Sequence, residues 1–388
     1  MRNGASGVSL DGVVVCLFAI GQWRIAVLAL RRARLHAHRR TLTAGMVVFE
    51  LLVAAGYACS FSQVASRIPF RGAVIWGAVT FLYLALSGAM AGVHAIAEPI
   101  RKRLDRETHP ARRRALRLAA NTLVAAPLVA IGYGALIERT RFEVREVDLP
   151  LAGLATDLDG LRILQLSDIH LSMFLSEREL ARMIDAACGL RAHLAFATGD
   201  FISTFGDPLE ACIRQLARVT ADAGMLGCLG NHERYARVEA EATRLAAQAG
   251  IRILRGESCR LRFGNAALNV AGIDYQPISR RPQYLRGVER LLDPVAPNLL
   301  LSHNPDVFPA AARQGWSLML AGHTHGGQVN VEILDEAINP ARFITYYTRG
   351  LYRIGPSAAY VTRGIGTIGI PARLGAPPEI SLIRLRKA

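Results

Sequence analysis

Long apolar stretches fill the first part of the chain, and four of them approach the ~20 residues that a helix needs to cross a bilayer. They run approximately over residues 8–30, 41–61, 72–97 and 115–137. The second stretch follows the first closely, so we interpret the first as a retained anchor rather than a cleaved signal peptide. The pattern predicts a transmembrane region of about four helices at 1–140, followed by a separate domain at 141–388.

Short strands alternate with amphipathic helices after residue 141. Buried strands are expected at 161–167, 192–198, 225–229, 298–301 and 317–320. Helices are expected at 176–190, 207–219 and 236–249, and the first of them opens with a capping box of Ser176 and Glu179. This alternation predicts a layered α/β domain, in which loops at the strand ends assemble a ligand site.

Residues suited to metal binding follow each of the expected strands. They are Asp168 and His170, Asp200, Asn231 and His232, His303, and His323 with His325. Mixed imidazole and carboxylate ligands suit zinc, manganese or iron rather than calcium. The members of the first and last pairs are two positions apart, so an extended backbone would place both side chains of a pair on one side.

A two-metal hydrolase is the chemistry that these residue types fit best. Two cations ~3.5–4 Å apart can lower the pKa of a bridging water, bind phosphoryl oxygens and stabilise charge during in-line attack. Asp200 offers two oxygens and can bridge two cations, while Asn231 supplies a neutral carbonyl oxygen. His232 is expected to act as the catalytic acid or base, because it adjoins a ligand without being needed to complete the ligand set. The neighbouring glycines are expected to permit sharp turns and close approach to phosphate. They are Gly199, Gly230 and Gly322.

Five ordered fragments of the second domain resemble the motifs of the calcineurin-like metallophosphoesterases. They are Asp168-Ile169-His170, Gly199-Asp200, Gly230-Asn231-His232-Glu233, His303 and Gly322-His323-Thr324-His325. The resemblance covers about residues 145–388, and the segments 326–328 and 371–380 are similar to the membrane-linked branch of that family. Glu233 stands where the family often has aspartate, and we expect it to lie outside the metal ligands.

The resemblance implies a four-layer α/β/β/α sandwich that binds two divalent metal ions, with manganese, zinc and iron as the candidates. By the same resemblance, His232 would lie beside the scissile phosphate. One metal would be held by Asp168, His170, Asp200 and His325. The other would be held by Asp200, Asn231, His303 and His323.

Several other polar residues are assigned by their local context. His193, at the start of a strand, is expected to be structural, and Ser302 and Thr324 are interpreted as loop hydrogen-bonding residues rather than nucleophiles. The dispersed cysteines form no CxxC pair, which argues against a zinc knuckle. Arginines that could contact a substrate phosphate are Arg349, Arg363 and Arg373.

Positive charge is concentrated beside the apolar stretches. Residues 1–140 carry 18 Lys and Arg against 6 Asp and Glu, a net charge of +12, so the remaining 28 against 25 give only +3 of the total +15. Positive charge in two short clusters beside apolar stretches does not form the basic face of a nucleic-acid-binding protein, so nucleic acid is not an expected partner. The basic connections, 31–40 and 98–114, should face the cytoplasm, which would place the catalytic domain on the extracytoplasmic side of the inner membrane.

Three functions are compatible with these features. The first is an integral-membrane phosphomono- or phosphodiesterase whose partners are the lipid bilayer and an envelope or lipid-linked phosphoester. The second is a pyrophosphate hydrolase of the UDP-2,3-diacylglucosamine type, as in lipid A synthesis, although such a cytoplasmic substrate conflicts with the predicted topology. The third is a metal-stabilised membrane sensor or scaffold. A complete ligand set with His232 left over favours catalysis.

Overall fold

The computed structural model describes residues 109–333, 336–369 and 371–388, together with isolated positions between 44 and 102. The chain divides into two compact units, Met1–Tyr133 and Gly134–Ala388. Apart from those isolated positions, the predicted spans 8–30, 41–61 and 72–97 lie outside the described residues. The second unit contains all of the predicted catalytic domain, 141–388.

Helix α5, Pro110–Leu136, overlaps the fourth predicted span at 115–137. Among the helices in the described part of the chain, none combines the length and the apolar composition needed to cross a membrane. The four-helix transmembrane region therefore stays a prediction.

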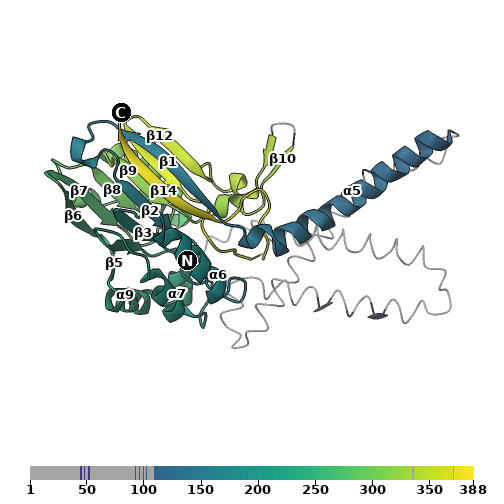
Figure 1. Cartoon of the computed structure of the whole chain (residues 1–388), viewed down its shortest axis with the longest axis horizontal. Helices are drawn as coiled ribbons and strands as arrows, with labels where there is room; N and C mark the ends of the chain where they lie inside the picture. Colours follow the sequence, from purple (N-terminus) through teal and green to yellow (C-terminus); the bar gives the residue numbers. More distant parts are fainter. Residues whose placement is uncertain are drawn as a thin grey trace, which may run out of the picture. The chain divides into compact units, whose positions relative to one another are not determined.

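The first six-stranded sheet of the second unit has the order β1-β14-β2-β3-β4-β5 (Figure 1). Strands β2 to β5 run parallel, while β14 pairs antiparallel with β2. Every residue of β3 and β4 is buried, as expected for parallel strands covered on both faces. The strands are β1 Glu143–Leu151, β14 Glu379–Lys387, β2 Arg162–Leu166, β3 Leu194–Thr198, β4 Met225–Cys228 and β5 Ile251–Ile253.

The second six-stranded sheet has the order β12-β13-β9-β8-β7-β6. Its four central strands are parallel, and its edge strands β12 and β6 pair antiparallel with their neighbours. The strands are β12 Gly350–Ile354, β13 Ser357–Val361, β9 Leu318–Ala321, β8 Asn298–Leu301, β7 Ala266–Gly272 and β6 Glu257–Phe263. A separate hairpin joins β10 Val331–Ile333 and β11 Glu336–Ile338.

Helices cover the outer faces of both sheets. The α-helices of the second unit are α6 Glu177–Cys188, α7 Leu209–Leu216, α8 Asn231–Ala236, α9 Glu239–Gln248 and α10 Phe308–Gln314. Short 3-10 helices are η2 Glu138–Thr140, η3 Thr156–Leu158, η4 Ile278–Gln283, η5 Glu289–Leu291, η6 Pro305–Val307, η7 His325–Gly327 and η8 Pro340–Phe343.

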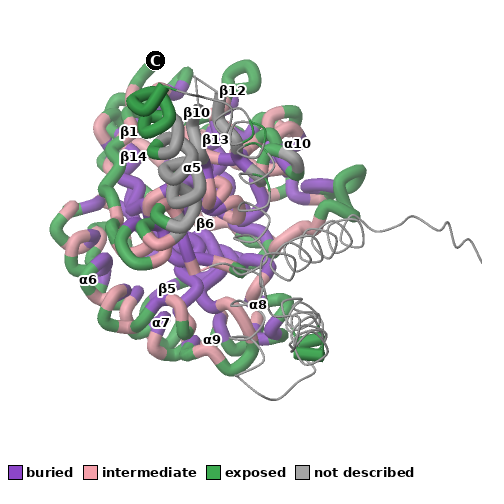
Figure 2. The backbone as a smooth tube through the Cα atoms, turned by 90° about the vertical axis from the view of Figure 1, so that its right-hand side faces the viewer, coloured by how far each residue is buried: buried purple, intermediate pink, exposed green. Residues whose placement is uncertain are grey.

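Three buried apolar clusters fill the spaces between the layers of the second unit. One packs α6, α7 and α9 against the outer face of the first sheet, as with Leu164 of β2 and Ile184 of α6. The second lies between the two sheets, where Phe196 and Leu320 belong to one cluster. The third packs α10 against the second sheet. Figure 2 shows this buried interior beneath helices whose outward turns are exposed. The result is a mixed α/β fold consistent with a metallophosphoesterase.

The sequence pattern located the strands of the site well. The strands expected at 161–167, 192–198 and 225–229 are β2, β3 and β4, and the capping box of Ser176 and Glu179 is formed at α6. The short helix α8 was not predicted. It begins at Asn231, so two site residues lie in its first turn rather than in a loop. This helix is too short for periodicity to reveal it.

Candidate metal centre

The predicted metal-binding residues come together where strands of both sheets end. Asp168 and His170 follow β2, Asp200 follows β3, and Asn231 follows β4 in the first sheet. In the second sheet, His303 follows β8, and His323 and His325 follow β9. A hydrogen bond from the His323 backbone N–H to Asp168 Oδ1, at 2.8 Å, joins the two sets of loops. The five fragments therefore lie at one edge of the sandwich.

The backbone at several of these residues is left-handed rather than extended, and this conformation sets the direction of their side chains. Five of the site residues have positive φ angles: Asp168 51°, His170 49°, Asp200 56°, His323 76° and His325 52°. The expectation that two-residue spacing acts through extended backbone was therefore wrong. Such conformations cost ~1–3 kcal/mol each and persist where surrounding contacts fix them. The strain lies at the residues whose side chains must converge.

Two of the predicted glycines make room for carboxylates. A Cβ atom at Gly322 would collide with Asp168 Oδ2 and Ser167 Oγ, and one at Gly230 would collide with the Asp200 carboxylate. Gly199, with φ of +86°, provides the sharp turn expected of it. Because Gly322 and Gly230 have no side chain, the carboxylates of Asp168 and Asp200 can lie directly against the backbone at these positions.

One group of side chains with metal-binding potential consists of Asp168, His170 and His325. Nε2 of His325 lies 3.2 Å from Nε2 of His170 and 3.5 Å from Asp168 Oδ1. All three residues are buried. The ring of His170 is held from its other side, because its Nδ1 lies 3.1 Å from the Ser203 hydroxyl.

A second group consists of Asp200, His303 and His323. Asp200 Oδ2 lies 2.9 Å from His303 Nε2 and 3.5 Å from His170 Nε2, so this one oxygen faces both groups. Nδ1 of His303 lies 2.7 Å from the carbonyl oxygen of Thr198. Since a carbonyl can only accept, Nδ1 carries a proton. Nε2 can then offer a lone pair to a cation once the proton that it shares with Asp200 is displaced.

Buried acceptor atoms provide a test of whether metals fit the site. Asp168 Oδ2 and Asn231 Oδ1 have no hydrogen-bond partner among the described residues. A third nitrogen, His303 Nε2, faces the Asp200 carboxylate at 2.9 Å and becomes an acceptor when it loses its proton. An acceptor left unpaired in the interior costs ~1–3 kcal/mol. All three atoms are of the kinds that bind divalent cations, so the donor set fits the metals that the sequence predicts.

The pKa values of these groups differ sharply. Burial raises the pKa of Asp168 to about 6. Burial alone would lower the pKa of His303, but the Asp200 and Asp168 carboxylates raise it to about 10. Burial and the neighbouring His303 lower the pKa of His323 to about 3. Burial also holds the pKa values of His170 and His325 well below the usual value, so most imidazoles of the site are neutral.

His232 lies beside both groups, in the first turn of α8. Its backbone N–H donates to Asp200 Oδ1 at 2.9 Å, and its ring packs edge-on against His170 with centroids 4.7 Å apart. Nδ1 lies 2.6 Å from the carbonyl oxygen of Ser203, so Nδ1 carries a proton and Nε2 is the nitrogen available for proton exchange. His232 could also join His170 and Asp200 in a third group of metal-binding potential.

Comparison with known proteins decides the family. The calcineurin-like phosphoesterase model matches residues 161–327. The metallophosphoesterase YkuE of Bacillus subtilis is 30% identical over 273 residues, which cover 69% of this chain and 93% of that protein. The chain belongs to the calcineurin-like metallophosphoesterase family. It is a metal-dependent hydrolase of phosphoester bonds, and the family uses two divalent metals.

Two further relatives show how the phosphoesterase domain occurs elsewhere. Phosphodiesterase YaeI of Escherichia coli is 28% identical over 290 residues, covering 71% of this chain and 98% of its own. A protein of Danio rerio named "Transmembrane protein with metallophosphoesterase domain" is 29% identical over 278 residues. That match covers 69% of this chain and 62% of the fish protein.

Some residues of the metallophosphoesterase site were missed from sequence alone. The buried carboxylate of Glu233 accepts from the backbone N–H groups of Asp200, Phe201 and Gly230 at 2.7 to 3.0 Å, so it shapes the Asp200 turn. This agrees with the expectation that Glu233 is not a metal ligand. Ser203 holds two histidine rings through its hydroxyl and its carbonyl. The capping spacing of Gly230 and Glu233 was the available signal for the first role, and none pointed to Ser203.

Two tyrosines also border the metallophosphoesterase site. The ring of Tyr275, which follows β7, lies 5.4 Å from the His323 ring and 6.2 Å from the His303 ring. The ring of Tyr235, on α8, lies 5.6 Å from the His232 ring. Burial, together with the nearby Tyr235, raises the pKa of the Tyr275 hydroxyl. Sequence alone gave no reason to pair residues from two different sheets.

The remaining predicted residues have structural partners. His193 Nδ1 accepts from the Arg162 backbone N–H at 2.9 Å, in keeping with a structural role. The hydroxyls of Ser302 and Thr324 donate to backbone carbonyls, as expected. Arg363 pairs with Glu379 at 2.7 Å and with Glu143 at 3.1 Å, rather than facing the site. Arg349 donates to the Gly375 carbonyl at 3.0 Å.

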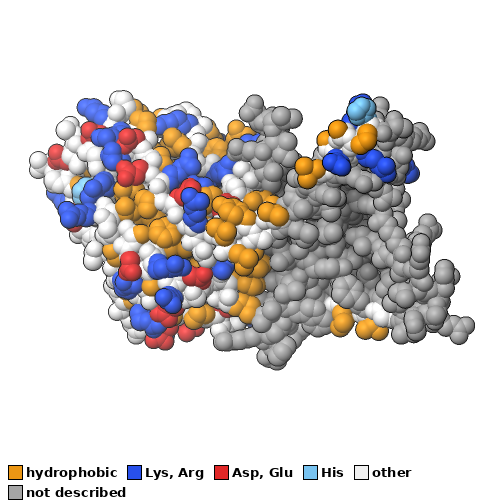
Figure 3. Space-filling model, turned by 45° about the vertical axis from the view of Figure 1, so that its right-hand side comes forward, with side chains coloured by type: hydrophobic (Ala, Val, Ile, Leu, Met, Phe, Trp, Pro, Cys, Tyr) orange, Lys and Arg blue, Asp and Glu red, His pale blue; other side chains and the backbone are white. Residues whose placement is uncertain are grey.

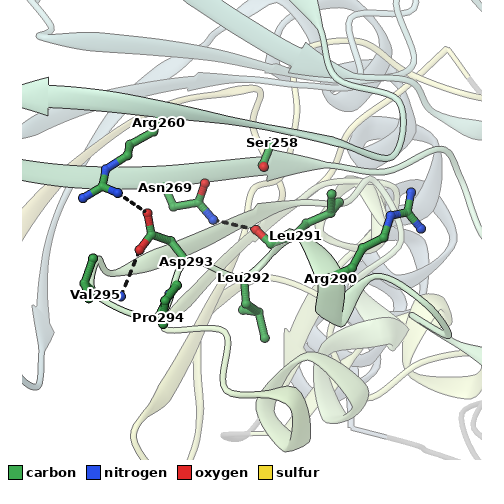
Figure 4. A pocket seen from close by; sticks show the side chains of 9 residues that line it. All are labelled: Ser258, Arg260, Asn269, Arg290, Leu291, Leu292, Asp293, Pro294 and Val295. Atoms are coloured by element: carbon green, nitrogen blue, oxygen red, sulfur yellow. Dashed lines mark hydrogen bonds and ion pairs between the residues drawn. The ribbon is translucent and has the colours of Figure 1, made fainter.

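A cavity of about 410 Å³ lies beside β6, and no predicted site residue lines it (Figure 4). Arg260 pairs with Asp293 at 3.0 Å across it, and Asn269 donates to the Leu291 carbonyl at 2.8 Å. These polar groups are satisfied internally. The charged and amide side chains that line the cavity are thus paired within the protein, so none of them calls for a ligand.

Proposed function

We propose that the protein is a membrane-anchored phosphodiesterase that uses two divalent cations to cleave an envelope or lipid-linked substrate. The observation that carries this proposal is a pair of buried acceptor atoms without hydrogen bonds, Asp168 Oδ2 and Asn231 Oδ1, among the converging imidazoles of the site. A sensor or scaffold would not need such a costly arrangement next to a histidine that is left for proton transfer.

Each cation would be held by residues from both sheets. Asp168, His170, Asp200 and His325 would hold one, and Asp200, Asn231, His303 and His323 would hold the other. Asp200 suits the shared position because its Oδ2 atom faces both groups. When bound, the cations supply positive charge to phosphoryl oxygens and lower the pKa of the attacking water. Manganese, zinc and iron all suit this ligand set.

His232 would donate a proton to the leaving oxygen. Its Nδ1 proton is committed to the Ser203 carbonyl, which fixes the ring and directs proton exchange to Nε2. Asp200 Oδ1 accepts from its backbone N–H, so the ring keeps a fixed place beside the shared carboxylate. We assign His232 to proton transfer rather than to metal binding, because the other residues already complete two ligand sets.

Exposed apolar side chains support a lipid-linked substrate. Four segments that follow strands β2, β3, β4 and β7 carry large apolar residues that are 50% to 77% exposed. These residues are Met173 after β2, Phe205 after β3, Tyr235 after β4 and Ile278 after β7. Apolar side chains also gather in a patch beside basic residues on the face of the molecule seen in Figure 3. Apolar side chains exposed together mark surfaces that bind lipid or protein partners.

The predicted spans would anchor the enzyme at the inner membrane as a multi-pass protein. The name of the Danio rerio relative supports a membrane location, and the name of the Escherichia coli relative supports diester cleavage. Basic connections at 31–40 and 98–114 would lie in the cytoplasm and the catalytic domain outside it. An alkaline-phosphatase fusion at the C-terminus should then be active. A fluorescent green-fluorescent-protein fusion at the same position would instead show that the C-terminus lies in the cytoplasm.

Purified full-length protein with Mn²⁺ should hydrolyse bis-p-nitrophenyl phosphate faster than p-nitrophenyl phosphate, and should also be tested on a lipid-linked pyrophosphate. His232→Ala should lower kcat by about 10²- to 10⁴-fold, the range for a general acid. His193→Ala is the matched control, because that histidine is bonded to the Arg162 backbone away from the metal groups. No turnover of any diester, or full turnover by His232→Ala, would refute the proposal.

A further inference from the structure

Arg373, in the segment between β13 and β14, is fully buried, at 0% exposure. Its guanidinium donates to backbone carbonyls on all three of its nitrogens. Nε donates to the Gly366 carbonyl at 2.9 Å, and Nη1 donates to the Ala376 carbonyl at 2.9 Å. Nη2 donates to the carbonyls of Arg363 and Gly364 at 2.9 and 3.1 Å. Such a buried cation is costly unless every donor is satisfied, so the site is built around it.

The carbonyls that Arg373 binds belong to the segment that supports the Asp168 loop. The Gly366 N–H donates to the Asp168 carbonyl at 2.6 Å, and the Ile365 N–H donates to the Ser167 carbonyl at 3.0 Å. A Cβ atom at Gly366 would collide with the backbone of Ile169, which shows how closely the two segments approach. Arg373 therefore holds one side of a segment whose other side holds a proposed metal ligand.

Arg373 also contacts the proposed ligand His325. Its Nη2 lies 3.3 Å from His325 Nδ1, and its Nη1 lies 3.4 Å from the His325 carbonyl oxygen. Because Nη2 has closer carbonyl acceptors, the contact with Nδ1 orients the ring without fixing its tautomer. With Nδ1 turned toward Arg373, Nε2 faces His170 at 3.2 Å.

The same segment is attached to the end of α5. The Arg373 N–H donates to the Gly134 carbonyl at 3.1 Å, and the Ala376 N–H donates to the buried Glu138 carboxylate at 3.1 Å. A Cβ atom at Gly134 would press against the Arg373 carbonyl. The place where the chain enters the catalytic unit is thus bonded to the residue that supports the Asp168 loop and His325.

We propose that Arg373 is a positioning residue of the metal centre, which fixes the Asp168–His170 backbone and the His325 ring and joins them to the end of α5. This inference rests on the ligand assignments of the proposed function. Left-handed φ angles of 51° and 49° at Asp168 and His170 need such external support, because neither residue favours that conformation by itself. Removing Arg373 should weaken metal binding before it prevents folding.

Arg373→Met and Arg373→Lys test this role in the full-length protein. Mn²⁺ affinity, measured by equilibrium dialysis with elemental analysis, should fall about 10- to 100-fold in Arg373→Met, the range for partners that orient metal ligands. The rise in Tm on adding Mn²⁺ to chelator-treated protein should shrink in parallel. Arg373→Lys should retain part of both. Arg384→Met is the matched control, since Arg384 lies on β14 and pairs with Glu146 at the surface.

Two outcomes would overturn the inference. One is Arg373→Met with a lower Tm but the Mn²⁺ affinity of the wild type, which would make the residue merely structural. The second outcome concerns the case in which Arg373→Met does not fold. Wild-type Mn²⁺ affinity in both Arg373→Lys and Gly134→Ala would then overturn the inference. Failure of the proposed function is distinguishable, because a wild-type protein that binds two Mn²⁺ ions without cleaving diesters would leave the role of Arg373 intact.

Discussion

Oδ2 of Asp200, which follows β3 of the first sheet, lies 2.9 Å from Nε2 of His303, which follows β8 of the second sheet. The same oxygen lies 3.5 Å from Nε2 of His170. One carboxylate therefore connects two groups of imidazoles that the two sheets supply separately. A cation on either side would share this oxygen, which makes Asp200 the residue on which both sites depend.

Asp200→Asn should remove both metals. The substitution keeps the size of the side chain and one oxygen, but it removes the negative charge that two cations would share. His325→Ala should mainly remove one metal, since His325 belongs to only one group. Elemental analysis of purified protein should give close to zero metals for the first variant and about one for the second.

Asp185→Asn is the control for charge removal, because Asp185 pairs with Arg218 at the surface of α6. Its metal content should match the wild type. Equal metal content in Asp200→Asn and His325→Ala would contradict the assignment of Asp200 as the shared ligand.

Metal affinity should rise with pH. His303, whose pKa is raised to about 10, holds a proton at neutral pH that a cation must displace. Below about pH 6, Asp168 is protonated as well, since burial raises its pKa to about 6. Log affinity for Mn²⁺ should therefore increase by about one unit per pH unit between pH 6 and 8, and more steeply below pH 6.

Isothermal titration in two buffers of different ionisation enthalpy measures these protons directly. About one proton should be released per His303-containing site at pH 7. The neutral state of His170 and His325, whose pKa values lie well below the usual range, means that these residues should release none. An affinity that does not change between pH 6 and 8 would show that His303 is not protonated in the metal-free protein.

The sequence predicted which residues meet at the site, because each candidate follows a strand that periodicity reveals. Asp168, Asp200 and His303 were placed at strand ends, and the structure brings them together. The backbone conformation of these site residues could not be predicted from the sequence pattern. Left-handed φ angles at Asp168 and His170 are imposed by remote segments such as the one containing Gly366, and no local pattern encodes those contacts.

The same limit applies to residues that support the site from a distance. Arg373 was considered as a contact for substrate phosphate because arginine binds phosphate well. Its partners are instead the carbonyls of Gly364, Gly366 and Ala376, all of them near it in sequence but arranged by the pairing of β13 and β14 with separate sheets. Long-range pairing, which periodicity does not report, decided its role.

Gly322→Ala should weaken the metal site that contains Asp168. The added Cβ would collide with Asp168 Oδ2 and Ser167 Oγ, so the carboxylate must move away from its present position. Overpacking of this kind costs ~1–3 kcal/mol of folding stability. Mn²⁺ affinity should fall by at least about tenfold, as expected when a ligand is misplaced.

Gly189→Ala is the control, because its Cβ would meet its nearest neighbour at 3.4 Å. Wild-type affinity in Gly322→Ala would show that the clearance is not needed.

Tyr275→Phe tests whether the tyrosine pair contacts the substrate. Burial raises the pKa of Tyr275, so its hydroxyl stays protonated and can donate to a phosphoryl oxygen. A hydrogen bond to a charged group contributes ~1.5–3 kcal/mol, so kcat/KM for bis-p-nitrophenyl phosphate should fall by about ten- to a hundredfold. Metal content should not change, since the ring that packs against His323 is retained. Tyr235→Phe should have a similar effect, and the double variant should lose less than the sum, because residues this close to each other do not act independently. Unchanged kcat/KM in the double variant would assign the pair to packing alone.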